Sequence, residues 1–166
     1  MKNIVLIGMP GCGKSTFGKK LAKKLALPFY DADAVLEERE KRTIKNFFAE
    51  SEEAFRKAET RTLAYLAQLD GAVIATGGGA VKRAENMALL KRAGVVVFLD
   101  REPVNILGCI GGDERPLLAA DKQRIYTLYD ERIALYRQYA DYTVANNGDF
   151  GSVLRELQKI AKNLEE

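Results

Sequence analysis

Short apolar runs alternate with amphipathic stretches along the whole chain. The runs have strand length, whereas the stretches between them place apolar residues at helical spacing, as in Phe17, Leu21 and Leu25. Strands are therefore expected at residues 3–7, 27–30, 72–75, 95–99 and 142–145. Helices are expected at residues 17–25, 33–41, 43–49, 51–69, 84–93, 121–140 and 151–164, with a short one after Pro103.

This alternation predicts the fold class. Strands that alternate with helices form a parallel sheet with helices on both faces, a three-layer α/β/α architecture with five strands. The all-apolar run Val95–Leu99 is expected near the centre of the sheet, where a strand is covered on both faces. Gly94 stands where a glycine would cap the preceding helix. No linker or repeat interrupts the pattern, so residues 1–166 are expected to form a single domain.

The segment Gly8–Thr16 carries the clearest chemical signal. It reads GMPGCGKST and lies between an apolar run and a helical pattern. The pattern GxxxxGK[ST] in this context predicts a phosphate-binding loop, whose backbone N–H groups point at phosphate oxygens. Lys14 adds a positive charge, and Ser15 offers a hydroxyl to Mg²⁺. The alternative is a glycine-rich turn with a chance lysine. The residues expected to bind a triphosphate are Gly11, Cys12, Gly13, Lys14, Ser15 and Thr16.

Further polar and glycine residues follow the ends of other strands. Asp31 and Asp33 come after the second strand, and Gly77–Gly79 after the third. Ligands of open α/β sheets bind beyond the carboxyl ends of the strands, so these residues are expected near the phosphate-binding loop. The carboxylates suit water-mediated Mg²⁺ binding or proton transfer, although Asp33 could simply cap a helix. The glycines allow a substrate to approach the backbone closely, or form a flexible turn.

Arginines supply candidate anion-binding groups. Arg56 and Glu59 lie one helical turn apart, and a surface ion pair is the plain interpretation. Arg132 shares a partly apolar helix face and could pair with a carboxylate of the protein or of a substrate. The segment 111–118, GGDERPLL, fits either a surface loop or a mobile flap. On a flap, Arg115 could stabilise a transferring phosphoryl group.

Composition narrows the function classes. The chain has no histidine, which removes the usual general base and the commonest zinc ligand. The net charge of +3 and the lack of a basic block with interleaved aromatics do not indicate nucleic-acid binding. No apolar run approaches the roughly 18 residues of a membrane span. Two cysteines, Cys12 and Cys109, give no disulfide framework, and the first strand begins too early for a leader peptide, so a cytoplasmic protein is expected.

Taken together, these motifs resemble the shikimate kinases over essentially the whole chain. The matching segments, in order, are Gly8–Thr16, Asp31–Asp33, Phe55–Glu59, Thr76–Val81, Glu85–Asn86, Val97–Leu99, Arg115–Leu118 and Arg132–Tyr136. The resemblance implies a P-loop NTPase fold of the nucleoside-monophosphate-kinase type, with substrate-binding helices at about 33–62 and a mobile lid at about 110–120. It further implies a cytoplasmic, monomeric, ATP-dependent phosphotransferase with an alcohol acceptor. The product would be shikimate 3-phosphate, an intermediate of chorismate and aromatic amino acid biosynthesis.

On the nucleotide side, the resemblance implies a role for each motif residue. Lys14 should hold the β- and γ-phosphates of ATP, Ser15 should bind Mg²⁺, and Asp31 should reach that ion through water. Arg115 should close with the lid onto the γ-phosphate. Lys14 and Arg115 are thereby predicted to be catalytic.

On the acceptor side, the resemblance implies that Arg56 and Arg132 clamp the carboxylate of shikimate. Asp33, the third predicted catalytic residue, should bind shikimate hydroxyls and help the 3-hydroxyl lose its proton. Gly78 should offer its backbone N–H to the substrate. The absence of histidine is compatible with this chemistry, because phosphoryl transfer depends mainly on positioning and positive charge.

Two departures from the family pattern concern the nucleotide base. An arginine that lies against adenine in the family is absent near Cys109. The segment 145–150, ANNGDF, lacks the usual acidic or hydroxyl residue after the strand. A weakened base contact and relaxed nucleotide selectivity are therefore expected.

Two other functions remain as alternatives. One is another small-metabolite kinase of the same type, such as a gluconate kinase, and the other is an ATP-binding switch without turnover. The pair Arg56 and Arg132, with Asp33, favours an acceptor that carries a carboxylate and hydroxyls. The retention of Lys14, Ser15, Asp33 and Arg115 argues against a switch.

Overall fold

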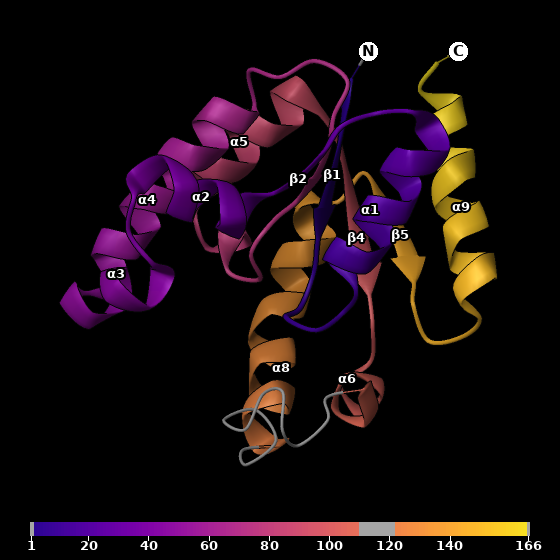
Figure 1. Cartoon of the computed structure of the whole chain (residues 1–166). Helices are drawn as coiled ribbons and strands as arrows, with labels where there is room; N and C mark the ends of the chain where they lie inside the picture. Colours follow the sequence, from indigo (N-terminus) through magenta and orange to yellow (C-terminus); the bar gives the residue numbers. More distant parts are fainter. Residues whose placement is uncertain (1, 110–121, 166) are drawn as a thin grey trace.

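The computed structural model describes residues 2–109 and 122–165, and these contain a five-stranded sheet. Its strand order is β2-β3-β1-β4-β5, and every neighbouring pair is parallel. The three-layer α/β/α prediction is confirmed (Figure 1). The strands are β1 (Asn3–Ile7), β2 (Phe29–Asp31), β3 (Val73–Ala75), β4 (Gly94–Asp100) and β5 (Tyr142–Ala145).

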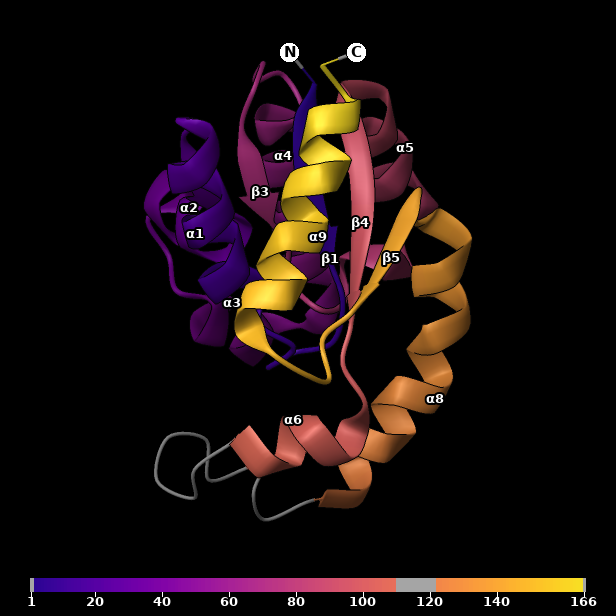
Figure 2. The same ribbon diagram turned by 90° about the vertical axis from the view of Figure 1, so that its right-hand side faces the viewer.

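Helices cover both faces of this sheet. Helices α1 and α9 pack against each other on one face, whereas α5 and α8 contact β4 from the other (Figure 2). Helices α2, α3 and α4 pack on one another beside the β2 edge (Figure 1). The helices are α1 (Lys14–Leu25), α2 (Ala32–Glu40), α3 (Ile44–Glu50), α4 (Glu52–Leu66), α5 (Ala84–Ala93), α6 (Pro103–Cys109), α8 (Lys122–Tyr139) and α9 (Phe150–Asn163), with a short 3₁₀ helix η1 (Ala80–Lys82).

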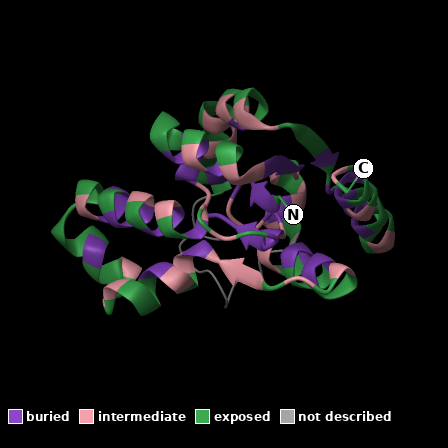
Figure 3. Ribbon diagram, turned by 90° about the horizontal axis from the view of Figure 1, so that it is seen from above, coloured by how far each residue is buried: buried purple, intermediate pink, exposed green. Residues whose placement is uncertain are grey.

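The buried core follows the apolar runs. All of β1 is buried, as are residues 95–99 of β4, which lies between β1 and β5. Viewed from above, buried residues fill the centre of the molecule and exposed residues line the outer surfaces of the helices (Figure 3). Among the described residues, no helix combines the length and hydropathy that a membrane crossing requires.

Gly94 differs from the sequence prediction. It follows α5 directly, but its φ of −176° is extended rather than left-handed, and it begins β4. A Cβ at Gly94 would collide with the backbone of Asn3, its partner in β1. The glycine therefore permits the close approach of two strands and does not form a helix cap of the left-handed kind.

Parallel strands place all their carboxyl ends at the same end of the sheet. The phosphate-binding loop follows β1, Asp31 ends β2, and the glycine run 77–79 follows β3. Both chain termini lie at the opposite end, the upper end in Figure 1. The motifs are therefore gathered at one end of the molecule, as the rule for open α/β sheets requires.

Candidate active site

The phosphate-binding loop wraps around the side chain of Lys14. The Nζ atom of Lys14 donates hydrogen bonds to the carbonyls of Gly8, at 2.6 Å, and Met9, at 2.9 Å, and the residue is buried. Gly11 and Gly13 have φ values of 79° and 100°, which side chains rarely tolerate. The sequence thus forms a tight loop with a cation at its centre.

Asp31 links this loop to the next strand. The hydroxyl of Ser15 donates to Asp31 Oδ2 at 2.7 Å, and Asp31 Oδ1 accepts from the backbone N–H groups of Asp33, at 3.0 Å, and Ala34, at 3.2 Å. Asp31 is therefore the N-cap of α2, and the alternative that Asp33 caps this helix is wrong. The cap leaves Asp33 available for other contacts. Ser15 and Asp31 together present hard oxygen atoms of the kind that Mg²⁺ prefers.

Asp33 lies in the first turn of α2 and faces the glycine run. A Cβ built on Gly77 would lie 3.0 Å from Asp33 Oδ1. Burial raises the pKa of Asp33 above its ordinary value, and the neighbouring Asp31 raises it further, although Lys14 and Arg56 act in the opposite direction. Asp33 is thus a partly desolvated carboxylate between two cations.

Arg56 forms a buried ion pair rather than the surface pair expected as the plain interpretation. Its NH1 atom lies 2.9 Å from Glu59 Oε1, and both residues are buried. Its NH2 atom lies 3.5 Å from the exposed carboxylate of Glu52, and its buried Nε has no hydrogen-bond partner within residues 2–109 and 122–165. A Cβ on Gly79 would lie 2.5 Å from Arg56 NH2, so the missing side chain makes room for the guanidinium.

The middle glycine connects the loop to α8. A Cβ on Gly78 would lie 2.7 Å from Pro10 Cδ and 3.3 Å from Arg132 NH1. The hydroxyl of Tyr136 donates to the Gly78 carbonyl at 2.6 Å. Each glycine of the run 77–79 thus has a side chain of another element packed against it, and the approach of a substrate to this backbone stays a prediction.

The structure therefore brings together most of the predicted site residues around the glycine run. Lys14, Ser15, Asp31 and Asp33 form one part of this cluster, and α4 and α8 bring in the two arginines. Arg115 and the lid expected at about 110–120 lie outside the described residues. Within the described part, the cluster combines cations that can hold anions with carboxylates, of which Asp33 can accept a proton.

Sequence reasoning assigned no role to Glu59 or Tyr136. Glu59 is buried, and burial raises its pKa while Arg56 lowers it. The signal for Glu59 was its position four residues after Phe55 and four residues before Leu63, on a helix face that carries apolar residues. The signal for Tyr136 was its position one turn after Arg132 on the same helix face.

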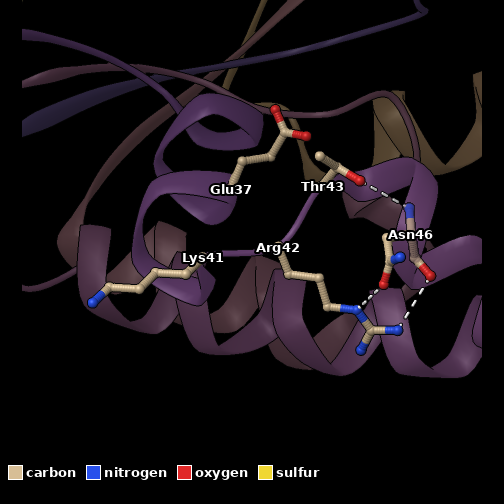
Figure 4. A pocket seen from close by; sticks show the side chains of 5 residues that line it. All are labelled: Glu37, Lys41, Arg42, Thr43 and Asn46. Carbon is tan, nitrogen blue, oxygen red and sulfur yellow. Dashed lines mark hydrogen bonds between the residues drawn. The ribbon is translucent and has the colours of Figure 1, made fainter.

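A separate pocket lies at the junction of α2 and α3. It has a volume of about 550 Å³ and is lined by Glu37, Lys41, Arg42, Thr43 and Asn46 (Figure 4). Glu37 accepts a hydrogen bond from the backbone of Ile44 at 2.9 Å, and Thr43 caps α3. These contacts stabilise the turn between the helices, and none of the lining residues belongs to the predicted site.

Comparisons with known proteins agree with this geometry. A family model described as shikimate kinase matches residues 10–162. Curated relatives include the shikimate kinases of Clostridium botulinum (strain Alaska E43 / Type E3), 43% identical over 98% of this chain and 99% of the relative, and of Vibrio parahaemolyticus, 43% identical over 99% and 97%.

Solved structures give the same result. The shikimate kinase of Acinetobacter baumannii in complex with shikimate has a TM-score of 0.88 and 37% identity, with 98% of this chain and 94% of the other covered. The enzyme of Aquifex aeolicus has a TM-score of 0.83 and 34% identity, with 98% of each chain covered. The YorR protein of Bacillus subtilis, at 14% identity and a TM-score of 0.63, shares only the fold.

Proposed function

Because this chain belongs to the shikimate kinase family, we propose that it transfers the γ-phosphoryl group of ATP to the 3-hydroxyl of shikimate. One observation carries the assignment of the acceptor. Arg56, Arg132 and Asp33 all pack against the glycine run 77–79, beside the phosphate-binding loop. A small acceptor with a carboxylate and hydroxyls matches two cations and one carboxylate in this arrangement.

Helices α2, α4 and α8 surround the acceptor. Helices α2 and α4 belong to the substrate-binding helices expected at about 33–62, and α8 supplies Arg132. The planar guanidinium groups of Arg56 and Arg132 match a carboxylate better than lysines would. The Nε of Arg56, which has no partner in the part of the chain that the structure describes, is a further donor available to the acceptor. Gly78 offers its N–H to the acceptor while Tyr136 holds its carbonyl.

Asp33 binds acceptor hydroxyls and takes the proton of the attacking 3-hydroxyl. The raised pKa of its carboxyl makes Asp33 a stronger base than an ordinary aspartate. The positive charges of Lys14 and Arg56 act in the opposite direction and limit this rise in pKa. Positioning of the hydroxyl contributes further to the rate enhancement.

The nucleotide is held by the phosphate-binding loop, with Lys14 on the β- and γ-phosphates. Ser15 would bind Mg²⁺ directly, and Asp31 would bind it through water, because their oxygen atoms suit this ion. When bound, Mg²⁺ neutralises charge that develops on the phosphates. Arg115, on a lid at about 110–120, adds a further positive charge to the γ-phosphate. We propose that the chain acts as one kinase domain, monomeric and cytoplasmic, without nucleic-acid or membrane partners.

A coupled ADP-release assay with purified protein, ATP and Mg²⁺ tests the assignment. Shikimate should support turnover, whereas gluconate and nucleoside monophosphates should not. The variant Lys14→Ala should lose turnover with shikimate and serves as the control for contaminating kinases. Turnover with gluconate in place of shikimate would contradict the proposed acceptor.

A further inference from the structure

The turn after β5 reaches back to the apex of the phosphate-binding loop through one side chain. Asn146 is only 6% exposed. Its Nδ2 donates a hydrogen bond to the carbonyl of Cys12 at 2.7 Å, and its backbone N–H donates to the carbonyl of Asp100, the last residue of β4, at 2.7 Å. One residue thereby joins the loop to the carboxyl ends of β4 and β5.

The Cys12 carbonyl has a particular need for this partner. Cys12 is buried and lies between Gly11 and Gly13, the residues with left-handed backbone conformations. Glycine backbone has wide conformational freedom, so a peptide between two glycines is held in place only by its contacts. A buried carbonyl without a donor is costly, and Asn146 supplies the donor.

The Asn146 amide also lies against the next residue of the loop. A Cβ on Gly13 would lie 3.2 Å from Asn146 Nδ2. Gly13 is the N-cap of α1, and its carbonyl accepts the first hydrogen bond of that helix, from Phe17, at 2.9 Å. Asn146 thus contacts the loop at the point where its N–H groups and the helix N-terminus would face a phosphate.

We propose that Asn146 is a positioning residue for the triphosphate. It fixes the Cys12–Gly13 peptide so that the loop is shaped for phosphate before the nucleotide arrives, and it makes no contact with the nucleoside. The inference rests on the proposed function only in that the loop binds ATP. Without the amide, part of the binding free energy of the nucleotide would be used to order the loop, and the affinity would fall.

Asn147 provides a matched control. It is exposed, and its Oδ1 accepts hydrogen bonds from the Glu102 backbone and from the side chain of Asn105, both at 2.9 Å. These contacts lead to the start of α6 and not to the phosphate-binding loop. A comparison of substitutions at Asn146 and Asn147 therefore distinguishes an effect on the phosphate-binding loop from a general effect on the turn after β5.

Calorimetric titration with ATP and, separately, with inorganic tripolyphosphate tests the proposal without an acceptor. Asn146→Ala should weaken both ligands by the same factor, roughly tenfold, because the lost hydrogen bond acts on the phosphate site. Asn146→Asp keeps the shape but loses the donor, and should weaken both ligands at least as much. Asn147→Ala should leave both affinities within about twofold of the wild type, as expected for an exposed contact remote from the loop. Thermal unfolding identifies a temperature at which each variant is folded.

The comparison of ligands decides between a positioning role and a direct contact. Weaker binding of ATP with unchanged binding of tripolyphosphate would mean that Asn146 contacts the nucleoside, and would overturn the proposal. Unchanged affinity for both ligands in the isosteric variant Asn146→Asp would also overturn it. Wild-type protein that binds ATP but does not phosphorylate shikimate would contradict the proposed function and leave this test intact.

Discussion

Asp33 combines a catalytic position with an unfavourable environment. Burial, followed by the charge of Asp31, raises the pKa of its carboxyl in the folded protein. Such a group contributes to stability in its protonated form, and that contribution is lost as pH rises through the folded-state pKa. Neutral pH lies above the ordinary pKa of the carboxyl, so Asp33 opposes folding there, and function retains it at a cost in stability.

The variant Asp33→Asn should consequently separate stability from activity. We expect kcat to fall by roughly 10²- to 10⁴-fold, as for the loss of a general base. The melting temperature at neutral pH should rise, and this gain should disappear below pH 3.8, the ordinary pKa of the carboxyl. Calorimetry across pH and a steady-state assay measure the two effects. A lower melting temperature at neutral pH would contradict the assigned direction of the pKa shift.

Glu52 competes with the acceptor carboxylate for the guanidinium group of Arg56. Its carboxylate lies 3.5 Å from Arg56 NH2 and 2.7 Å from Lys82 Nζ. Exposed pairs of this kind are weak, so Glu52→Gln should lower the KM for shikimate by only about twofold, with kcat unchanged. Steady-state kinetics at low ionic strength give the clearest readout, because salt screens exposed charges.

Glu53 offers the control for that substitution. Glu53 lies in the same helical turn and pairs with Arg83 at 2.6 Å instead of with Arg56. Glu53→Gln removes the same charge, so an equal decrease in KM would mean that net charge alone is responsible.

At the residue scale, the sequence predicted which side chains meet but not how they are paired. The strand-end rule placed Asp31, Asp33 and the glycines together, and the structure confirms their proximity. It could not tell that Asp31 rather than Asp33 caps α2, because both precede or begin the helix and both can accept backbone N–H groups. Likewise, the i,i+3 spacing of Arg56 and Glu59 is the same on an exposed and on a buried face.

At the scale of elements, α8 acts on the site through two residues one turn apart. Arg132 lies against Gly78, and Tyr136 donates its hydroxyl proton to the carbonyl of the same glycine. Burial raises the pKa of Tyr136 to about 12, so the phenol remains a neutral donor at physiological pH. Tyr136 also stacks on Phe98 with ring centroids 5.0 Å apart, which fixes the helix on β4.

The variant Tyr136→Phe keeps this stacking and removes only the hydrogen bond. We expect the KM for shikimate to rise by roughly fivefold, the scale of one buried hydrogen bond, whereas the KM for ATP should be unchanged. Tyr129→Phe is the matched control on the same helix, since its hydroxyl bonds to Asp100 at 3.1 Å. Equal effects of the two variants on the KM for shikimate would contradict a specific role for Tyr136.

The strand and helix pattern was predicted more accurately than the ends of the elements. Hydrophobic periodicity located all five strands, but β2 begins at Phe29 rather than at residue 27. Helix α4 ends at Leu66 rather than at residue 69. Periodicity reports burial, and apolar residues such as Leu69 remain packed on the core after the helix has ended.

At the scale of the whole molecule, the carboxyl end of the sheet holds the two halves of the proposed reaction as separate groups of residues. Ser15 and Asp31 are hydrogen-bonded to each other, whereas Arg56 and Arg132 lie against the glycine run. The sequence predicted the common location because parallel strands end together, whereas the division between nucleotide and acceptor came from the family resemblance. The closure over both halves, assigned to a lid at about 110–120, stays a prediction.

Because the two groups of residues are separate, removal of Mg²⁺ should impair the nucleotide half of the reaction and leave acceptor binding unchanged. Chelation with EDTA should lower turnover by at least about 100-fold, because charge on the phosphates is no longer neutralised. Shikimate binding, measured by calorimetry without nucleotide, should change by less than about twofold, because the proposed acceptor contacts involve arginines and no metal. Added Mg²⁺ should restore turnover, which controls for damage by the chelator. A loss of shikimate binding on chelation would place the metal at the acceptor and contradict the division between Ser15–Asp31 and the arginine pair.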